Sequence, residues 1–163
     1  MANVCRTDIK IKANEAAIKD FASRYEVCND GLYPNEQGSP HIIDEFGAQA
    51  ELLIDRIGSK WVQMYDPWPY WEEGMTEYDF ALESAWYPPS DMMKEMYRQL
   101  TIIDPNTEME GRYWDEGFCP IGVFKFIDGE LVTLEEDVEI DEDEEYYWDE
   151  QIEPVFDRLK EQL

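Results

Sequence analysis

Carboxylates are the most abundant side chains in this sequence that could do chemistry, and they are concentrated towards the C-terminal end. Residues 135–150 contain eleven acids among sixteen residues and no base. Such a run is typical of a solvated tail, but the aromatic residues inside it and the amphipathic segment after it indicate that it is pinned to the domain or to a partner. We therefore predict an acidic, partner-binding surface made of Glu135, Glu136, Asp137, Glu139, Asp141, Glu142, Asp143, Glu144 and Glu145.

The spacing of these acids partly matches a calcium-binding loop, in which acidic ligands alternate at the early positions. Counted from Asp137, the sixth position is Glu142 and the twelfth is Trp148, whereas an EF-hand needs glycine and glutamate there. The three cysteines are far apart and fit neither a disulfide framework nor a zinc site. We expect no structural metal and no cofactor.

Catalytic constellations are not recognisable in the sequence. His41 is the only histidine, and no nucleophile elbow, glycine-rich phosphate loop or His-Glu-x-x-His motif occurs. Acidic pairs are so frequent that none can be singled out as a general acid and base. We predict that the protein is not an enzyme.

The overall charge limits the class of partner. The chain of 163 residues has 39 acids and 13 bases, and its formal charge is −26. Direct binding to nucleic acid requires Lys and Arg to neutralise phosphates, so this charge favours a basic or neutral partner. No segment approaches the length of an apolar membrane span, and the N-terminal residues contain no apolar signal region. We expect a cytoplasmic protein with no membrane partner.

Exposed aromatic residues are the second kind of candidate binding group. Trp68, Tyr70 and Trp71 share one proline-containing loop and are hard to bury together, so we predict that they anchor a protein interface. Trp61 and Trp86 could instead stack nucleic-acid bases on a sheet. Because residues 61–91 contain no base to neutralise phosphates, we expect both tryptophans to lie in the core.

Hydrophobic periodicity predicts the elements that must position these groups. Strict alternation predicts strands at 4–12 and 77–86, and a short aromatic strand is expected at 61–65. Asn14 and Asp44 can cap helices, and a further helix should begin at Pro89 or Ser90. Two more strand-like segments precede an Asp128-Gly129 hairpin turn and a returning strand, and a short amphipathic helix ends the chain.

Three motifs follow one another along the chain: Gly58-Ser59-Lys60-Trp61, Ser84-Ala85-Trp86-Tyr87-Pro88-Pro89 and Arg112-Tyr113-Trp114-Asp115-Glu116-Gly117. Together, and in this order, they resemble the YubB-type ferredoxin-like proteins of phages and plasmids. The resemblance implies an α+β fold, a ferredoxin-like antiparallel sheet with helices on one face, in agreement with the order of the elements. We expect residues 1–134 to form this domain and residues 135–163 to form an acidic extension that ends in a short helix and packs on it.

Two functional hypotheses follow, and a small hydrolase with carboxylate chemistry, which would need a buried carboxylate of raised pKa in a pocket, is a remaining third. In the first, a protein of a mobile genetic element acts as a DNA mimic, an anti-CRISPR or anti-restriction inhibitor whose acidic surface occupies the basic surface of a host nucleic-acid-binding protein. In the second, an accessory protein binds single-stranded nucleic acid on the ferredoxin-like sheet, and the acidic extension competes with that binding.

Overall fold

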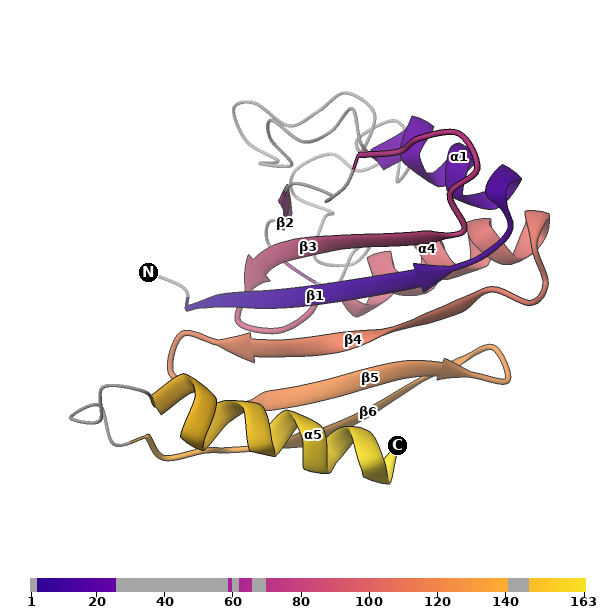
Figure 1. The fold of residues 1–163 in the computed structure, drawn as a ribbon. Coiled ribbons are helices and arrows are strands. Elements are labelled where there is room, and N and C mark those ends of the chain that lie inside the picture. The colour runs from indigo at the N-terminus through magenta and orange to yellow at the C-terminus, as the bar shows by residue number, and fades with distance from the viewer. Residues whose placement is uncertain (1–2, 26–58, 60–61, 66–69, 141–146) are drawn as a thin grey trace.

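The computed structural model describes residues 3–25, 59, 62–65, 70–140 and 147–163. Their strands form one antiparallel sheet in the order β2-β3-β1-β4-β5-β6 (Figure 1). The α+β class and the antiparallel sheet are thus confirmed. The elements in chain order are β1 (Val4–Lys12), α1 (Glu15–Tyr25), β2 (Val62–Tyr65), β3 (Glu77–Ala85), α4 (Ser90–Ile103), β4 (Glu108–Asp115), β5 (Ile121–Ile127), β6 (Glu130–Glu136), the π-helical turn η3 (Trp148–Ile152) and α5 (Glu153–Gln162).

Strand β1 lies in the middle of the sheet and pairs with both β3 and β4. Its odd-numbered residues from Cys5 to Ile11 are buried on one face, and Arg6, Asp8 and Lys10 lie on the other face. This follows from the two-residue repeat of an extended strand. The predicted cap at the end of the strand is also present, because the side-chain oxygen of Asn14 accepts a hydrogen bond from the backbone of Ala17 at 2.9 Å.

Helices lie on both faces of the sheet. The buried faces of α1 and α4 form the main core with the buried side chains of β1 to β5, as expected for helices on one face. Helix α5 lies on the opposite face, in front of the sheet in Figure 1, and forms a second core with β5 around Val123, Phe156 and Leu159. The predicted division after residue 134 falls within β6.

The β5–β6 hairpin closes where the sequence predicts, with positive φ angles of 50° at Asp128 and 84° at Gly129. Gly122 in β5 lies opposite Tyr113, and a Cβ atom at position 122 would be 2.2 Å from the tyrosine ring. Glycine is therefore required for the two strands to pair here. In the described part of the chain, no helix combines the length and the apolar character needed to cross a membrane.

Candidate functional site

The start of the acidic segment is part of the folded domain. Val138 and Ile140 pack against the second core, and the backbone N–H of Val138 donates to the carbonyl oxygen of Phe118 at 3.2 Å. The alternation of β6 continues, so Asp137 and Glu139 are exposed while Val138 and Ile140 are half-buried. The predicted site residues Asp141, Glu142, Asp143, Glu144 and Glu145 lie outside the described residues.

Three segments come together around Phe118 at this end of the sheet. The β4–β5 turn carries Phe118 itself, and its ring centroid lies 6.2 Å from that of Tyr147 and 6.0 Å from that of Trp148. The third segment follows β6 and is held by the hydrogen bond from Val138 to Phe118. Aromatic contacts of this kind fix the segments relative to one another.

These segments present five exposed carboxylates, which we call the acidic end: Glu116, Asp137, Glu139, Asp149 and Glu150. Among the described residues, no basic side chain forms a salt bridge with any of them. Their charge is therefore directed to solvent. Chemically, such a surface can attract basic side chains of a partner.

Two of the predicted acids have partners inside the protein. Glu135 faces the α1/α4 side of the sheet, where its carboxylate accepts a hydrogen bond from the hydroxyl of Tyr113 at 2.7 Å. Burial and this bond to a carboxylate raise the pKa of Tyr113. Glu136 faces the other side and pairs with Arg158 of α5. The structure thus assigns these two acids to internal contacts, which the charge pattern alone did not indicate.

Glu153, at the start of α5, attaches the helix to the sheet. Its carboxylate accepts two hydrogen bonds from Arg112 at 2.8 and 2.9 Å and one from the indole of Trp148 at 2.9 Å. Partial burial opposes ionisation, but these bonds hold the pKa of Glu153 below its ordinary value. The Arg112 guanidinium also lies over the rings of Trp114 and Phe156, at 5.7 and 5.0 Å from their centroids.

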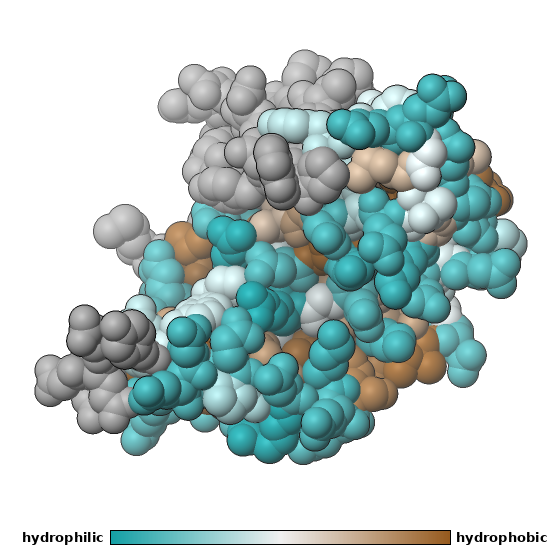
Figure 2. Space-filling model, in the orientation of Figure 1, coloured by the Kyte–Doolittle hydropathy of each residue, from teal (hydrophilic) through white to brown (hydrophobic). Residues whose placement is uncertain are grey.

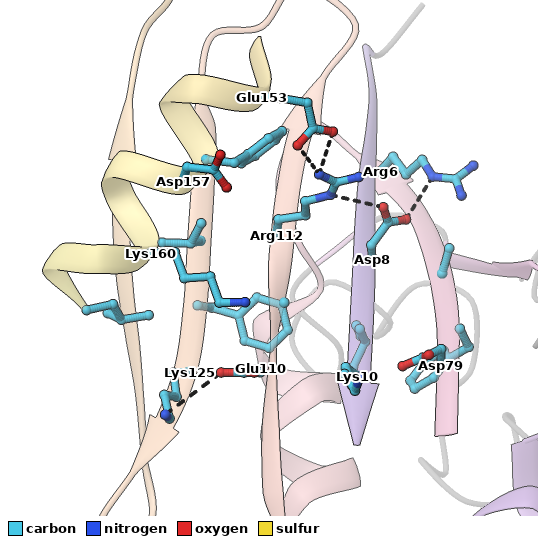
Figure 3. A pocket seen from close by; sticks show the side chains of 18 residues that line it. Arg6, Asp8, Lys10, Asp79, Glu110, Arg112, Lys125, Glu153, Asp157 and Lys160 are labelled. Atoms are coloured by element: carbon cyan, nitrogen blue, oxygen red, sulfur yellow. Dashed lines mark hydrogen bonds and ion pairs between the residues drawn. The ribbon is translucent and has the colours of Figure 1, made fainter. Parts of the chain in front are cut away.

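A groove of about 600 Å³ runs beside α5 over the open part of the same sheet face (Figure 3). Its size is within the range of small-ligand sites. Hydrophilic residues dominate this side of the molecule (Figure 2). The charged residues that line the groove are Arg6, Lys10, Arg112, Lys125 and Lys160, together with Asp8, Asp79, Glu110, Glu153 and Asp157.

Ion pairs neutralise most of the charge in this groove. Asp8 lies between two guanidinium groups, 3.0 Å from Arg6 and 3.4 Å from Arg112, and Lys125 is 3.8 Å from Glu110. Five bases and five acids leave no net charge. The arrangement can hold a small ligand of mixed charge, but it does not form a positive channel for nucleic acid. The sequence alone does not reveal this groove, because only the register between β1, β3 and β4 and the docking of α5 bring these residues together.

The structure separates the three predicted aromatic anchors. Trp68 lies outside the described residues. Tyr70 is 46% exposed, and Trp71 packs against the main core with the Lys19 ammonium 5.7 Å from its ring centroid. Their role in binding stays a prediction, and of the two that are described, Tyr70 is the more accessible.

The expectation that Trp86 lies in the core is wrong. Strand β3 ends at Ala85, one residue earlier than predicted, and Trp86 has a φ of 65° and is 43% exposed. Continued alternation would have placed Trp86 on the buried face with Tyr78 and Leu82, but the left-handed backbone turns it out of the sheet. Trp61 lies outside the described residues.

The remaining candidates for chemistry are the buried carboxylate of Asp115 and clusters of metal-ligating side chains. Asp115 is a buried carboxylate, but it accepts hydrogen bonds from the backbone N–H groups of Gly117 and Cys119 at 2.9 and 2.8 Å. These bonds shape the β4–β5 turn, so its role is structural. Within the described ranges, no group of three or more His, Cys, Asp or Glu side chains is arranged to hold a metal ion.

Comparison with known proteins identifies the family. Residues 68–153, more than half of the chain, match the family model of the ferredoxin-like domain in Api92-like protein. The match includes β3 to β6 and α4, and it ends where α5 begins. No curated protein and no solved structure matches the chain. The chain therefore belongs to the family of ferredoxin-like domains found in Api92-like proteins.

Proposed function

We propose that this protein is a non-enzymatic binding protein that occupies the basic nucleic-acid-binding surface of a host protein with its acidic surface. In its finer form, the proposal is a DNA mimic of the anti-CRISPR or anti-restriction class. It would belong to the YubB-type proteins of phages and plasmids and act in the cytoplasm of the host cell. The contact is supplied by the acidic end together with the acids of residues 141–145.

One observation carries this proposal: the carboxylates of the acidic end are exposed on packed segments and have no basic partner among the described residues. A formal charge of −26 destabilises a compact protein through self-repulsion. Acids that stabilise the fold are paired, as Glu153 is with Arg112. The acidic end gathers five such acids on three segments that pack against one another, and a basic partner would supply the counter-charge that this concentration lacks.

The alternative, binding of a single strand on the sheet, is less favoured by the geometry. Helix α5 covers the part of the sheet face formed by β4 and β5, and Trp114 lies beneath Trp148 and Phe156 there. The open part of the face is the groove, whose bases are largely engaged by carboxylates. Stacking on an exposed aromatic residue and neutralisation of phosphates would both require rearrangement.

In the experiment, the tagged protein captures partners from host lysate at low and at high salt. One half of the lysate is treated with nuclease beforehand, and the other half is left untreated. The captured proteins are identified, and binding of the main one to the purified protein is then measured against salt. A four-fold variant, with Asp137→Asn, Glu139→Gln, Asp149→Asn and Glu150→Gln, should lose affinity and salt dependence. The matched control removes four exposed acids elsewhere, with Glu72→Gln, Glu73→Gln, Glu108→Gln and Asp128→Asn.

Both variants lose the same net charge, so the comparison isolates position from charge. Retention of the partner in nuclease-treated lysate and a larger loss with the acidic-end variant support the proposal. Equal losses from both variants contradict the assigned surface. Recovery of nucleic acid, or of partners only in the untreated half, favours the single-strand alternative instead.

A further inference from the structure

Two neighbouring aromatic side chains are exposed at the turn between β3 and α4. Trp86 is 43% exposed and Tyr87 is 59% exposed, and Pro88 and Pro89 follow them directly. The turn is built by hydrogen bonds: the hydroxyl of Ser84 donates to the carbonyl oxygen of Tyr87 at 2.6 Å, and the N–H of Tyr87 donates to Ala85 at 2.8 Å. Large exposed aromatics on a fixed turn are typical of the residues that dominate protein interfaces.

This turn lies at the same end of the sheet as the acidic end. The carbonyl oxygen of Asn3 accepts a hydrogen bond from the N–H of Trp86 at 2.9 Å, and the carbonyl oxygen of Val4 accepts one from the N–H of Glu116 at 3.1 Å. The successive residues Asn3 and Val4 therefore connect the aromatic turn to Glu116, the first member of the acidic end in chain order. In Figure 1 this is the end where β3 and β4 finish and α5 begins.

The combination of groups favours one kind of partner side chain. An aromatic face attracts a cation by its quadrupole, and arginine also stacks flat on the ring. Neighbouring carboxylates accept the N–H donors of a guanidinium in pairs, which an ammonium group cannot reproduce. Within the described residues, no base forms a salt bridge with Glu116 or with the other members of the acidic end.

We propose that Trp86 and Tyr87 are the aromatic anchors of the partner interface and that they bind arginine side chains of a basic partner protein, next to the acidic end. This inference rests on the proposed function and adds to it the anchor residues and the preference for arginine over lysine. It also differs from the sequence-based assignment of the anchors to Trp68, Tyr70 and Trp71.

The test uses two labelled peptides of equal length, oligoarginine and oligolysine, titrated with the full chain and followed by fluorescence anisotropy at several salt concentrations. The wild-type protein should bind oligoarginine about two- to fivefold more tightly than oligolysine. Tyr87→Leu keeps an apolar side chain without the aromatic face, and Trp86→Asn introduces a residue that tolerates the left-handed turn. Each variant should reduce the preference, and the double variant should abolish it.

Two controls accompany these variants. Ile102→Ala removes a side chain that is 69% exposed at the end of α4, near the far end of the sheet, and should leave the preference unchanged. Tyr70→Leu tests the competing anchor. Thermal unfolding of each variant shows whether the fold is kept. If Trp86→Asn does not fold, Tyr87→Leu still tests the inference, because the side chain of Tyr87 is mostly exposed and its replacement should not disturb the fold.

The outcomes separate this inference from the proposed function. If the acidic-end variant weakens both peptides while Tyr87→Leu leaves the arginine preference intact, the acidic surface stands and the anchor assignment is wrong. A loss of preference with Tyr70→Leu alone likewise overturns the assignment to Trp86 and Tyr87. If the acidic-end variant weakens neither peptide, the proposed acidic surface itself is contradicted. A loss of preference confined to the Trp86 and Tyr87 variants supports the inference.

Discussion

In the groove, the carboxylates of Asp8, Glu110 and Glu153 face basic side chains at 2.8 to 3.8 Å, whereas at the acidic end Asp137 and Glu139 face solvent. Each region contains five acids; the groove lies over the sheet, and the acidic end borders one end of the same sheet. The difference between them is the presence of bases on the neighbouring strands. In a protein with a charge of −26, whether an acid is paired with a base therefore says more about its role than the number of acids around it.

The sheet register produces this difference. In the groove, Lys10 of β1 lies between Asp79 of β3 and Glu110 of β4, and Arg112 lies next to Asp8. Opposite charges across neighbouring strands stabilise a sheet modestly. The segments at the acidic end contribute acids only, because residues 135–150 contain no base. One region therefore pairs most of its charges internally, and the other requires ions or a partner.

The largest expected effect concerns the packing of helix α5, which follows the acidic residues 135–150, on the sheet. Phe156 is 3% exposed and fills the space between α5 and Trp114. Phe156→Ala should lower the free energy of unfolding by about 3 kcal/mol, because it removes a buried ring and leaves a cavity. Denaturant unfolding measures the change. The neighbouring exposed acid provides the control, since the stability of Asp157→Ala should stay within about 0.5 kcal/mol of wild type. If both variants had equally small effects on the free energy of unfolding, α5 would not be packed as described.

A smaller effect is expected when one hydrogen-bonded acid of the groove is neutralised. Glu153→Gln should destabilise the protein by about 1 kcal/mol at neutral pH, a modest value because roughly a third of each partner is exposed. The pKa of Glu153 is lower in the folded state than its ordinary value of 4.5. Its contribution is therefore fully present above about pH 4.5 and is lost as the pH falls through the folded-state pKa.

The matched variant for this prediction is Glu150→Gln, because Glu150 is exposed and precedes the same helix. Unfolding curves of both variants and the wild type are recorded from neutral to acid pH. The difference between wild type and Glu153→Gln should shrink towards acid pH, and Glu150→Gln should show no such loss. A pH-independent difference for Glu153→Gln would contradict the ion pair as its cause.

The smallest effects should have opposite signs in the two regions. Glu110→Gln leaves Lys125 without its partner and should destabilise by about 0.5 kcal/mol or less. Glu139→Gln relieves repulsion among unpaired acids and should stabilise by a similar amount. Both changes should diminish with added salt, because screening weakens interactions between exposed charges. If both variants changed the free energy of unfolding in the same direction, the distinction between the paired acids of the groove and the unpaired acids of the acidic end would be contradicted.

Much of the fold follows from local patterns in the sequence. The alternation at residues 4–12 gives β1, Asn14 begins α1, and Asp128-Gly129 closes the last hairpin, because each of these signals acts within a few residues. The final amphipathic helix is also present as α5. The periodicity of a helix identifies its apolar face but not the sheet face on which it packs, so the position of α5 opposite α1 and α4 was not predictable.

The candidate site was predicted less completely, for physical reasons that particular residues illustrate. The concentration of acids is visible in the sequence, but the contacts of Glu135 with Tyr113 and of Glu136 with Arg158 depend on strand register and on helix docking. Trp86 continues a perfect alternation, and only its positive φ places it on the surface. A left-handed tryptophan has no local sequence signal comparable to a glycine or an asparagine.

The central position of β1 has a consequence for the order in which the protein can fold during synthesis. Among the described strands, β1 is made first, yet its partners are β3 and β4, with Val4 opposite Ala85 and Cys5 opposite Asp115. Pairing over such sequence separations is slow, whereas the β5–β6 hairpin closes locally. On the ribosome, β1 must therefore wait until residue 115 has emerged before the middle of the sheet can be completed.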